Sequence, residues 1–196
     1  MGIDPAPFMA NLFLHYYENK FIKSLIENGD LDKATKLKDT FRYLDDLLSI
    51  NDDLYFKDII CSMYPNELKL SATNSDLFST EFLDLDISIS EGKLLTKVFD
   101  KRRNFSFKAI NYPDLKFSNV PYNPSYGIYF SQLIRILRIC NKLEYFMDEL
   151  KLLTHSFLAK GFCKMELKNI FMRFISKYKQ EWGKFGEEVP LPEYLC

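Results

Sequence analysis

Apolar residues recur every three or four positions over residues 8–28, and this spacing predicts an amphipathic helix. Pro5 and Pro7 suit the start of a helix, and Gly29 suits its end. The apolar positions are Phe8, Met9, Leu12, Phe13, Tyr16, Tyr17, Phe21, Ile22, Leu25 and Ile26.

The next part of the chain changes pattern several times. Residues 30–40 are charged and indicate a surface connection or a short helix. Residues 41–50 place aromatic and aliphatic runs on either side of Asp45 and Asp46, which predicts two short strands with the acidic pair at the turn. A short helix is expected over residues 54–63, and residues 68–73 alternate like an edge strand.

The clearest strand pattern lies at residues 82–89. Four aliphatic residues face one way, while Asp84 and Asp86 face the other, so we expect an exposed polar side. A turn at residues 90–93 then leads into a second strand at 94–99.

Helical periodicity returns three times after a segment rich in proline. The predicted helices are residues 126–140, 143–159 and 164–182, and short turns between them indicate a small bundle. The expected fold class is α+β, with helices and antiparallel hairpins followed by a three-helix bundle. The expected division is residues 1–110, a linker at 111–125, the bundle at 126–182 and a tail at 183–196.

Composition places the chain among globular proteins. Of its 196 residues 47% are hydrophobic, and no apolar run approaches the roughly 20 residues of a membrane helix. No signal peptide is visible, and the four cysteines form no CxxC pair, which fits free thiols in a reducing compartment. We therefore expect an intracellular protein, nuclear or cytoplasmic, with no membrane partner.

Positive charge is concentrated in one stretch, although the formal net charge is only −1. Residues 92–142 contain ten basic residues and only Asp100 and Asp114 as acids. A merely soluble surface would intersperse both signs, so this stretch predicts a track for a polyanion. The basic residues are Lys93, Lys97, Lys101, Arg102, Arg103, Lys108, Lys116, Arg135, Arg138 and Lys142.

The pair Asp45-Asp46 is an unusual choice for a hairpin tip, where Asp-Gly or Asn-Gly is preferred. Carboxylates fixed at a strand end offer oxygen ligands to a hard cation such as Mg²⁺. The alternative is a solvated loop, which is our interpretation of Asp52-Asp53.

Tyr43-Leu44-Asp45-Asp46 resembles motif C of reverse transcriptases, and further segments follow in the order typical of Penelope-like and related eukaryotic reverse transcriptases. The likeness covers roughly residues 1 to 180. Its other segments are Met1-Gly2 with Pro7, which resemble the end of motif B, then Asp100-Lys101-Arg102, Asn111-Tyr112-Pro113 and Val120-Pro121-Tyr122-Asn123-Pro124-Ser125-Tyr126-Gly127.

The resemblance implies an RNA-directed DNA polymerase, with residues 1–110 as a partial palm and the helical bundle as a thumb. It implies that Asp45 and Asp46 are catalytic and bind Mg²⁺ or Mn²⁺, and that Tyr43 and Gly2 lie near the primer end or nucleotide. Expected partners are deoxynucleoside triphosphates and an RNA or DNA template with its primer. The residues expected at the template and primer phosphates are Lys101, Arg102, Arg103, Arg135, Arg138 and Lys142, the last three on one face of the first bundle helix.

The chain begins inside the motif B pattern, so the motif A aspartate and the fingers of the family would lie upstream of Met1. We therefore expect residues 1–196 to be inactive in isolation. One alternative is a catalytically inactive nucleic-acid-binding remnant of such an element. Another is an unrelated α+β protein with an accidental Asp-Asp pair.

Overall fold

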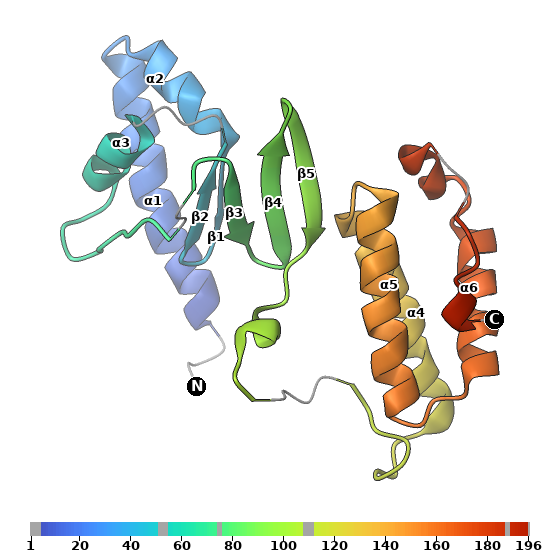
Figure 1. Cartoon of the computed structure of the whole chain (residues 1–196). Helices are drawn as coiled ribbons and strands as arrows, with labels where there is room; N and C mark the ends of the chain where they lie inside the picture. The colour runs from blue at the N-terminus through green and yellow to red at the C-terminus, as the bar shows by residue number, and fades with distance from the viewer. Residues whose placement is uncertain (1–4, 51–54, 74–75, 108–111, 187–188, 196) are drawn as a thin grey trace. The chain divides into compact units, whose positions relative to one another are not determined.

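The computed structural model describes residues 5–50, 55–73, 76–107, 112–186 and 189–195. These residues form six α-helices and two small antiparallel sheets, which confirms the predicted α+β class (Figure 1). Contacts divide the chain into two compact units, Met1–Thr73 and Asn74–Cys196, called here the N-terminal and C-terminal units.

The first predicted helix is confirmed as α1, Ala6–Glu27, in the N-terminal unit. It ends because Gly29 takes a left-handed φ of 79°, which lets the Gly29 amide donate to the carbonyl of Ile26 and the Asp30 amide to that of Leu25. This is the pattern of a Schellman C-cap. The charged segment that follows is the short helix α2, Leu31–Lys36.

The acidic pair lies at the tip of a hairpin, as the sequence predicts. Strands β1, Thr40–Tyr43, and β2, Asp46–Ser49, pair antiparallel around a two-residue turn. Leu47 packs against the core of the N-terminal unit, to which α3, Tyr55–Met63, also contributes. The buried residues of this core are Leu25, Leu37, Ile59, Ile60, Met63 and Tyr64.

Two strand predictions in the middle of the chain are wrong. Residues 68–73 form no strand, and residues 82–89 are not one strand. The structure has β3, Ser79–Phe82, a turn at Leu83-Asp84, and then β4, Leu85–Ser90, followed by β5, Lys93–Val98. Aliphatic residues continue at every second position through the turn, so periodicity alone does not reveal the reversal.

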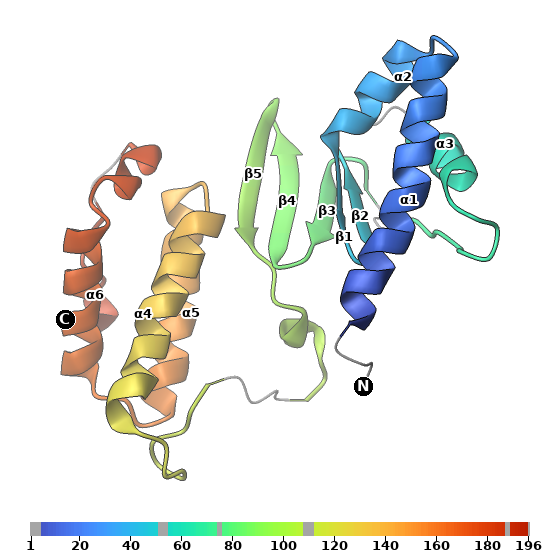
Figure 2. The same ribbon diagram turned by 180° about the vertical axis from the view of Figure 1, so that it is seen from behind.

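The three predicted helices of the C-terminal unit are confirmed, with changed ends. They are α4, Tyr122–Ile139, α5, Leu143–Ala159, and α6, Lys164–Lys177. Figures 1 and 2 show α4 beside both α5 and α6. Helix α4 begins inside the expected linker. The core of the C-terminal unit is rich in aromatic side chains, and five of them are fully buried: Tyr129, Phe146, Phe157, Phe171 and Phe174.

The end of the chain is part of this core. Residues 183–196 were expected to form a polar tail, but Leu195 is buried and Val189, Leu191 and Tyr194 pack against the same cluster. Trp182, which the sequence placed at the end of the third helix, lies in the 3₁₀ turn Glu181–Phe185 instead. None of the helices in the described residues is long and apolar enough to cross a bilayer.

One edge of the three-stranded sheet is attached to the bundle. The Asn141 side chain accepts from the Thr96 amide at 3.0 Å and donates to the Leu94 carbonyl at 2.6 Å. The Thr96 hydroxyl donates to the Ile139 carbonyl at the end of α4. Asn141 therefore satisfies backbone groups of β5 that an exposed edge strand would leave unpaired.

Candidate metal and nucleic-acid sites

The acidic tip is exposed and tightly turned. Tyr43 pairs with Asp46 across the hairpin, which leaves Leu44 and Asp45 as the two turn residues. Both carboxylates are exposed. Leu44 has a φ of 52°, a left-handed conformation that costs a residue with a side chain roughly 1–2 kcal/mol. The turn therefore has local backbone strain at Leu44, its first residue, directly before Asp45.

Arg42 ties this turn to α1. Its Nε donates to Glu18 Oε1 at 2.5 Å, and its Nη1 donates to Asn11 Oδ1 at 2.8 Å. Nη1 also lies 3.4 Å from the carbonyl oxygen of Leu44. The Tyr64 hydroxyl donates to the same Glu18 carboxylate at 2.7 Å. Burial and this hydrogen bond raise the pKa of Tyr64 above its ordinary value.

Asp45 and Asp46 are candidate Mg²⁺ ligands, because proteins often bind this ion through only one or two carboxylates together with water and phosphate oxygens. Tyr43 and Asp46 are paired residues and therefore share the face of the hairpin opposite Arg42 and Leu47. The described residues contain no group of three His, Cys, Asp or Glu that could hold a metal. Gly2 lies outside the described residues.

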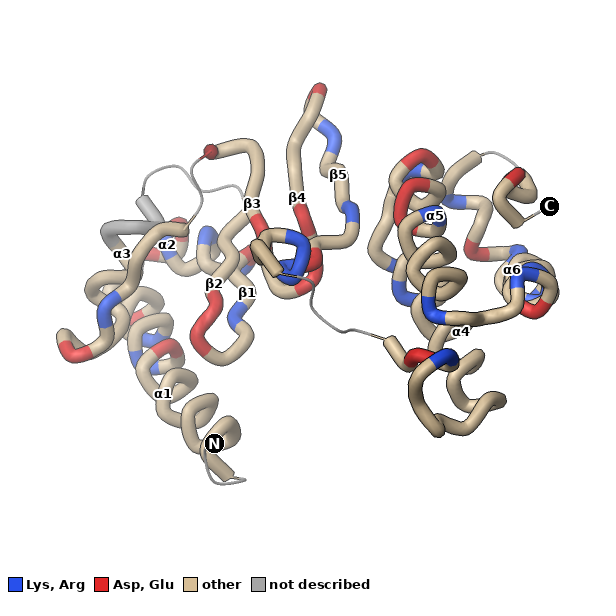
Figure 3. Tube along the Cα trace, turned by 60° about the horizontal axis from the view of Figure 1, so that its bottom comes forward, with Lys and Arg blue, Asp and Glu red and all other residues tan. Residues whose placement is uncertain are grey.

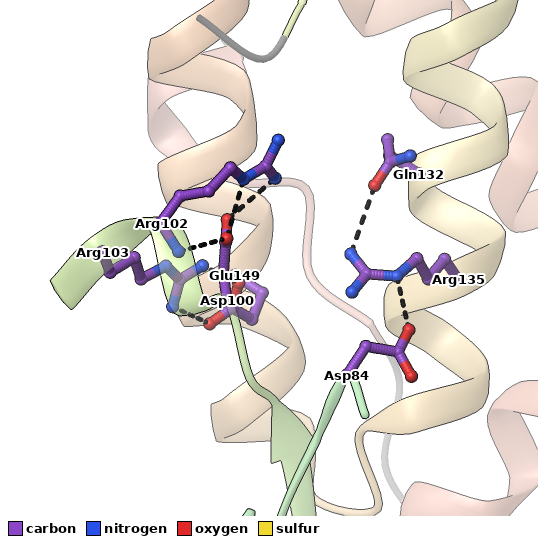
Figure 4. Close-up of polar contacts among 7 residues, drawn as sticks. All are labelled: Asp84, Asp100, Arg102, Arg103, Gln132, Arg135 and Glu149. Atoms are coloured by element: carbon purple, nitrogen blue, oxygen red, sulfur yellow. Dashed lines mark hydrogen bonds and ion pairs between the residues drawn. The ribbon is translucent and has the colours of Figure 1, made fainter. Parts of the chain in front are cut away.

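Two of the predicted phosphate-binding arginines are held by carboxylates in the C-terminal unit (Figure 4). Arg102 Nε and Nη2 donate to the two Asp100 oxygens at 2.8 and 2.9 Å. Arg103 donates to both oxygens of Glu149 on α5, at 2.8 and 2.5 Å. The hydrogen bonds from Arg102 hold the pKa of Asp100 below its usual range. Both arginines are therefore already paired with carboxylates in the protein alone.

Arg135 of α4 is paired as well. Its Nε donates to Asp84 Oδ2 at 2.8 Å, across the sheet–bundle contact. The prediction that Arg135, Arg138 and Lys142 share one face of a helix is wrong for Lys142. Helix α4 ends at Ile139, the backbone is extended at the next residue, and Lys142 is the N-cap of α5.

The remaining predicted basic residues, Lys101, Arg138 and Lys142, are exposed. Within the described residues none of them forms a salt bridge, and Lys142 lies over the Tyr145 ring. Figure 3 shows basic and acidic residues in both units. Three exposed cations, rather than all six, are therefore available to a polyanion without breaking an ion pair.

The residues that hold these groups in place were not predicted from the sequence. Glu18 lies 24 positions from Arg42, and Glu149 lies 46 positions from Arg103. No periodicity joins positions so far apart. One signal was available for the second hairpin, because Phe82-Leu83-Asp84 repeats the aromatic-Leu-Asp order of the first tip, and Leu83 also has a positive φ.

Comparison with protein-family models, with curated proteins and with solved structures gave no match. The function is therefore inferred from the order of motifs and from the geometry of these sites.

Proposed function

We propose that this chain is the C-terminal part of a reverse transcriptase similar to the Penelope-like group, with a partial palm and a thumb. The N-terminal unit would carry the metal-binding carboxylates, and α4–α6 would form the thumb. The order of motifs along the sequence supports the family. The exposed acidic tip is the observation that carries the proposal.

The geometry of the tip fits this role. Asp45 lies in the turn and Asp46 opens β2, so both carboxylates face solvent at one end of the hairpin. Arg42 anchors the turn to α1, which reduces the freedom of the two carboxylates before any cation binds. In nucleotidyl transfer, two divalent cations roughly 3.5–4 Å apart activate the attacking hydroxyl and stabilise the leaving pyrophosphate.

Manganese binding, followed by electron paramagnetic resonance of free Mn²⁺, tests the proposal. The wild-type chain should bind Mn²⁺, and the double variant Asp45→Asn with Asp46→Asn should lose that binding. The matched control is Asp32→Asn with Asp39→Asn, which removes two exposed carboxylates from the same unit but not from the tip. Equal binding by all three proteins would contradict the proposal.

Primer extension is expected to be absent from residues 1–196 with either Mg²⁺ or Mn²⁺. The described residues do not complete a group of three ligands, and the family takes a further aspartate from its motif A. Template-dependent incorporation of deoxynucleotides by the purified chain would show that a further ligand had been overlooked.

A second function, nucleic-acid binding without catalysis, is favoured by the exposed cations Lys101, Arg138 and Lys142. A remnant of this kind would bind a primer–template duplex but would not bind Mn²⁺ at the acidic tip. The metal titration together with a duplex-binding assay separates the two functions.

A further inference from the structure

Two phenylalanines follow the basic turn and stack on each other while facing solvent. The rings of Phe105 and Phe107 are 5.1 Å apart between centroids and 15° from parallel. Phe105 is 43% exposed and Phe107 is 66% exposed. Two neighbouring, parallel and exposed rings leave a flat apolar surface in water, which is unfavourable in the protein alone.

Local structure sets this arrangement before any ligand binds. Asp100 caps the 3₁₀ turn Lys101–Asn104 by accepting from the Arg102 amide at 3.1 Å. Arg103 attaches the same turn to α5 through Glu149. The chain then becomes extended at Phe105 and bends at Ser106 and Phe107, which brings the two rings together. A ligand would meet a surface that is already formed.

The turn that precedes the rings is polar, and among the described residues its unpaired charge is positive. Lys101, Asn104 and Ser106 are exposed. Lys101 has no ion pair among the described residues, whereas Arg102 and Arg103 are each matched by a carboxylate. The charge left in this turn after the two ion pairs is positive, which favours an anionic ligand over an uncharged apolar one. An aromatic ring flanked by an anion fits both the stacked rings and the lysine.

We propose that Phe105 and Phe107 form a stacking platform for an unpaired nucleobase of a single-stranded nucleic acid, with Lys101 contacting a neighbouring phosphate. Exposed aromatic faces beside cations are the usual means of binding single strands without sequence preference. The inference rests on the nucleic-acid binding in the proposed function, but it requires neither Asp45 nor Asp46.

Fluorescence anisotropy with the full chain tests the platform, using labelled oligo(dT) and oligo(U) of about twelve nucleotides, within the usual range of site sizes. An abasic strand of the same length carries the same phosphates without bases, and a blunt duplex carries no unpaired base. The wild-type chain should prefer both base-containing strands to the abasic strand. A preference for only one sugar type would show whether RNA or DNA is the ligand.

The test variant is Phe105→Ala with Phe107→Ala, and the matched control is Phe117→Ala, another exposed ring of the same unit. Loss of stacking for one base should weaken single-strand binding by roughly 5- to 140-fold. Abasic and duplex binding should not change, and neither should any affinity of the control. Both substitutions are at exposed positions, so tryptophan fluorescence should report an unchanged fold.

Three results would overturn the platform. These are equal wild-type affinity for the abasic and base-containing strands, an equal loss in the Phe117→Ala control, and no binding to any single strand. If duplex binding remains in the first or third case, the stacking inference is wrong while the nucleic-acid binding of the proposed function stands.

Discussion

Replacing the three exposed cations Lys101, Arg138 and Lys142 by alanine should weaken duplex binding and make it less sensitive to salt. These are the predicted phosphate-binding residues that form no salt bridge in the described part of the chain. Each phosphate that a protein neutralises on B-DNA contributes about −0.9 to the slope of log affinity against log salt. If each residue contacts one phosphate, the slope should become shallower by about 2.7.

The difference is large enough to measure. Between 50 and 200 mM salt, a slope steeper by about 2.7 means that the affinity of the wild type falls by a factor roughly 40 times larger than that of the variant. Anisotropy of a labelled duplex over this range gives both slopes directly. No ion pair is broken by these substitutions, so the unfolding transition followed by tryptophan fluorescence should remain close to that of the wild type.

The control for this experiment removes the same amount of charge elsewhere in the C-terminal unit. Lys151, Lys164 and Lys179 are exposed and lie outside the basic stretch. Their replacement by alanine should leave the salt slope nearly unchanged. Equal slopes for the wild type and the Lys101, Arg138 and Lys142 variant, or equal effects of the two triple variants, would refute a specific cationic surface.

Three further predictions concern stability. Arg42→Ala should destabilise the N-terminal unit by about 2 kcal/mol, because the half-buried Glu18 carboxylate loses its cationic partner and keeps only the Tyr64 hydroxyl, and faster amide exchange in the hairpin would show this. Glu91→Asn should stabilise the β4–β5 hairpin by about 1 kcal/mol, since Glu91 has a φ of 52° that asparagine tolerates better; an unchanged unfolding midpoint would contradict it. Asp100, whose pKa is lowered by Arg102, should stabilise the C-terminal unit above the ordinary aspartate pKa of about 3.9. That contribution should disappear as the pH falls through the lowered pKa. The free energy of unfolding in urea should therefore differ most between the wild type and Asp100→Asn near neutral pH.

Local patterns were sufficient for much of the fold. The helical spacing over residues 8–28 and 143–159 predicted α1 and α5 because side-chain direction in a helix follows from backbone geometry alone. The acidic hairpin was predicted for a similar reason, since apolar residues on both sides of a polar pair favour two strands and a turn. The predicted ends of helices and strands were less accurate. The β3–β4 turn was missed because apolar and polar residues continue to alternate through it.

The α+β class, the helices and the acidic tip could be predicted from the sequence, because each depends on residues close together along the chain. The tertiary structure decided which carboxylates pair with Arg103 and Arg135, whereas Arg102 pairs with Asp100 only two residues away. Along the sequence Arg102, Arg103 and Arg135 belong to one basic stretch, but Glu149 and Asp84 come from outside it, 46 and 51 positions away from Arg103 and Arg135. Packing of the sheet against the helices brings these carboxylates to the arginines, and no local pattern of residues records that contact.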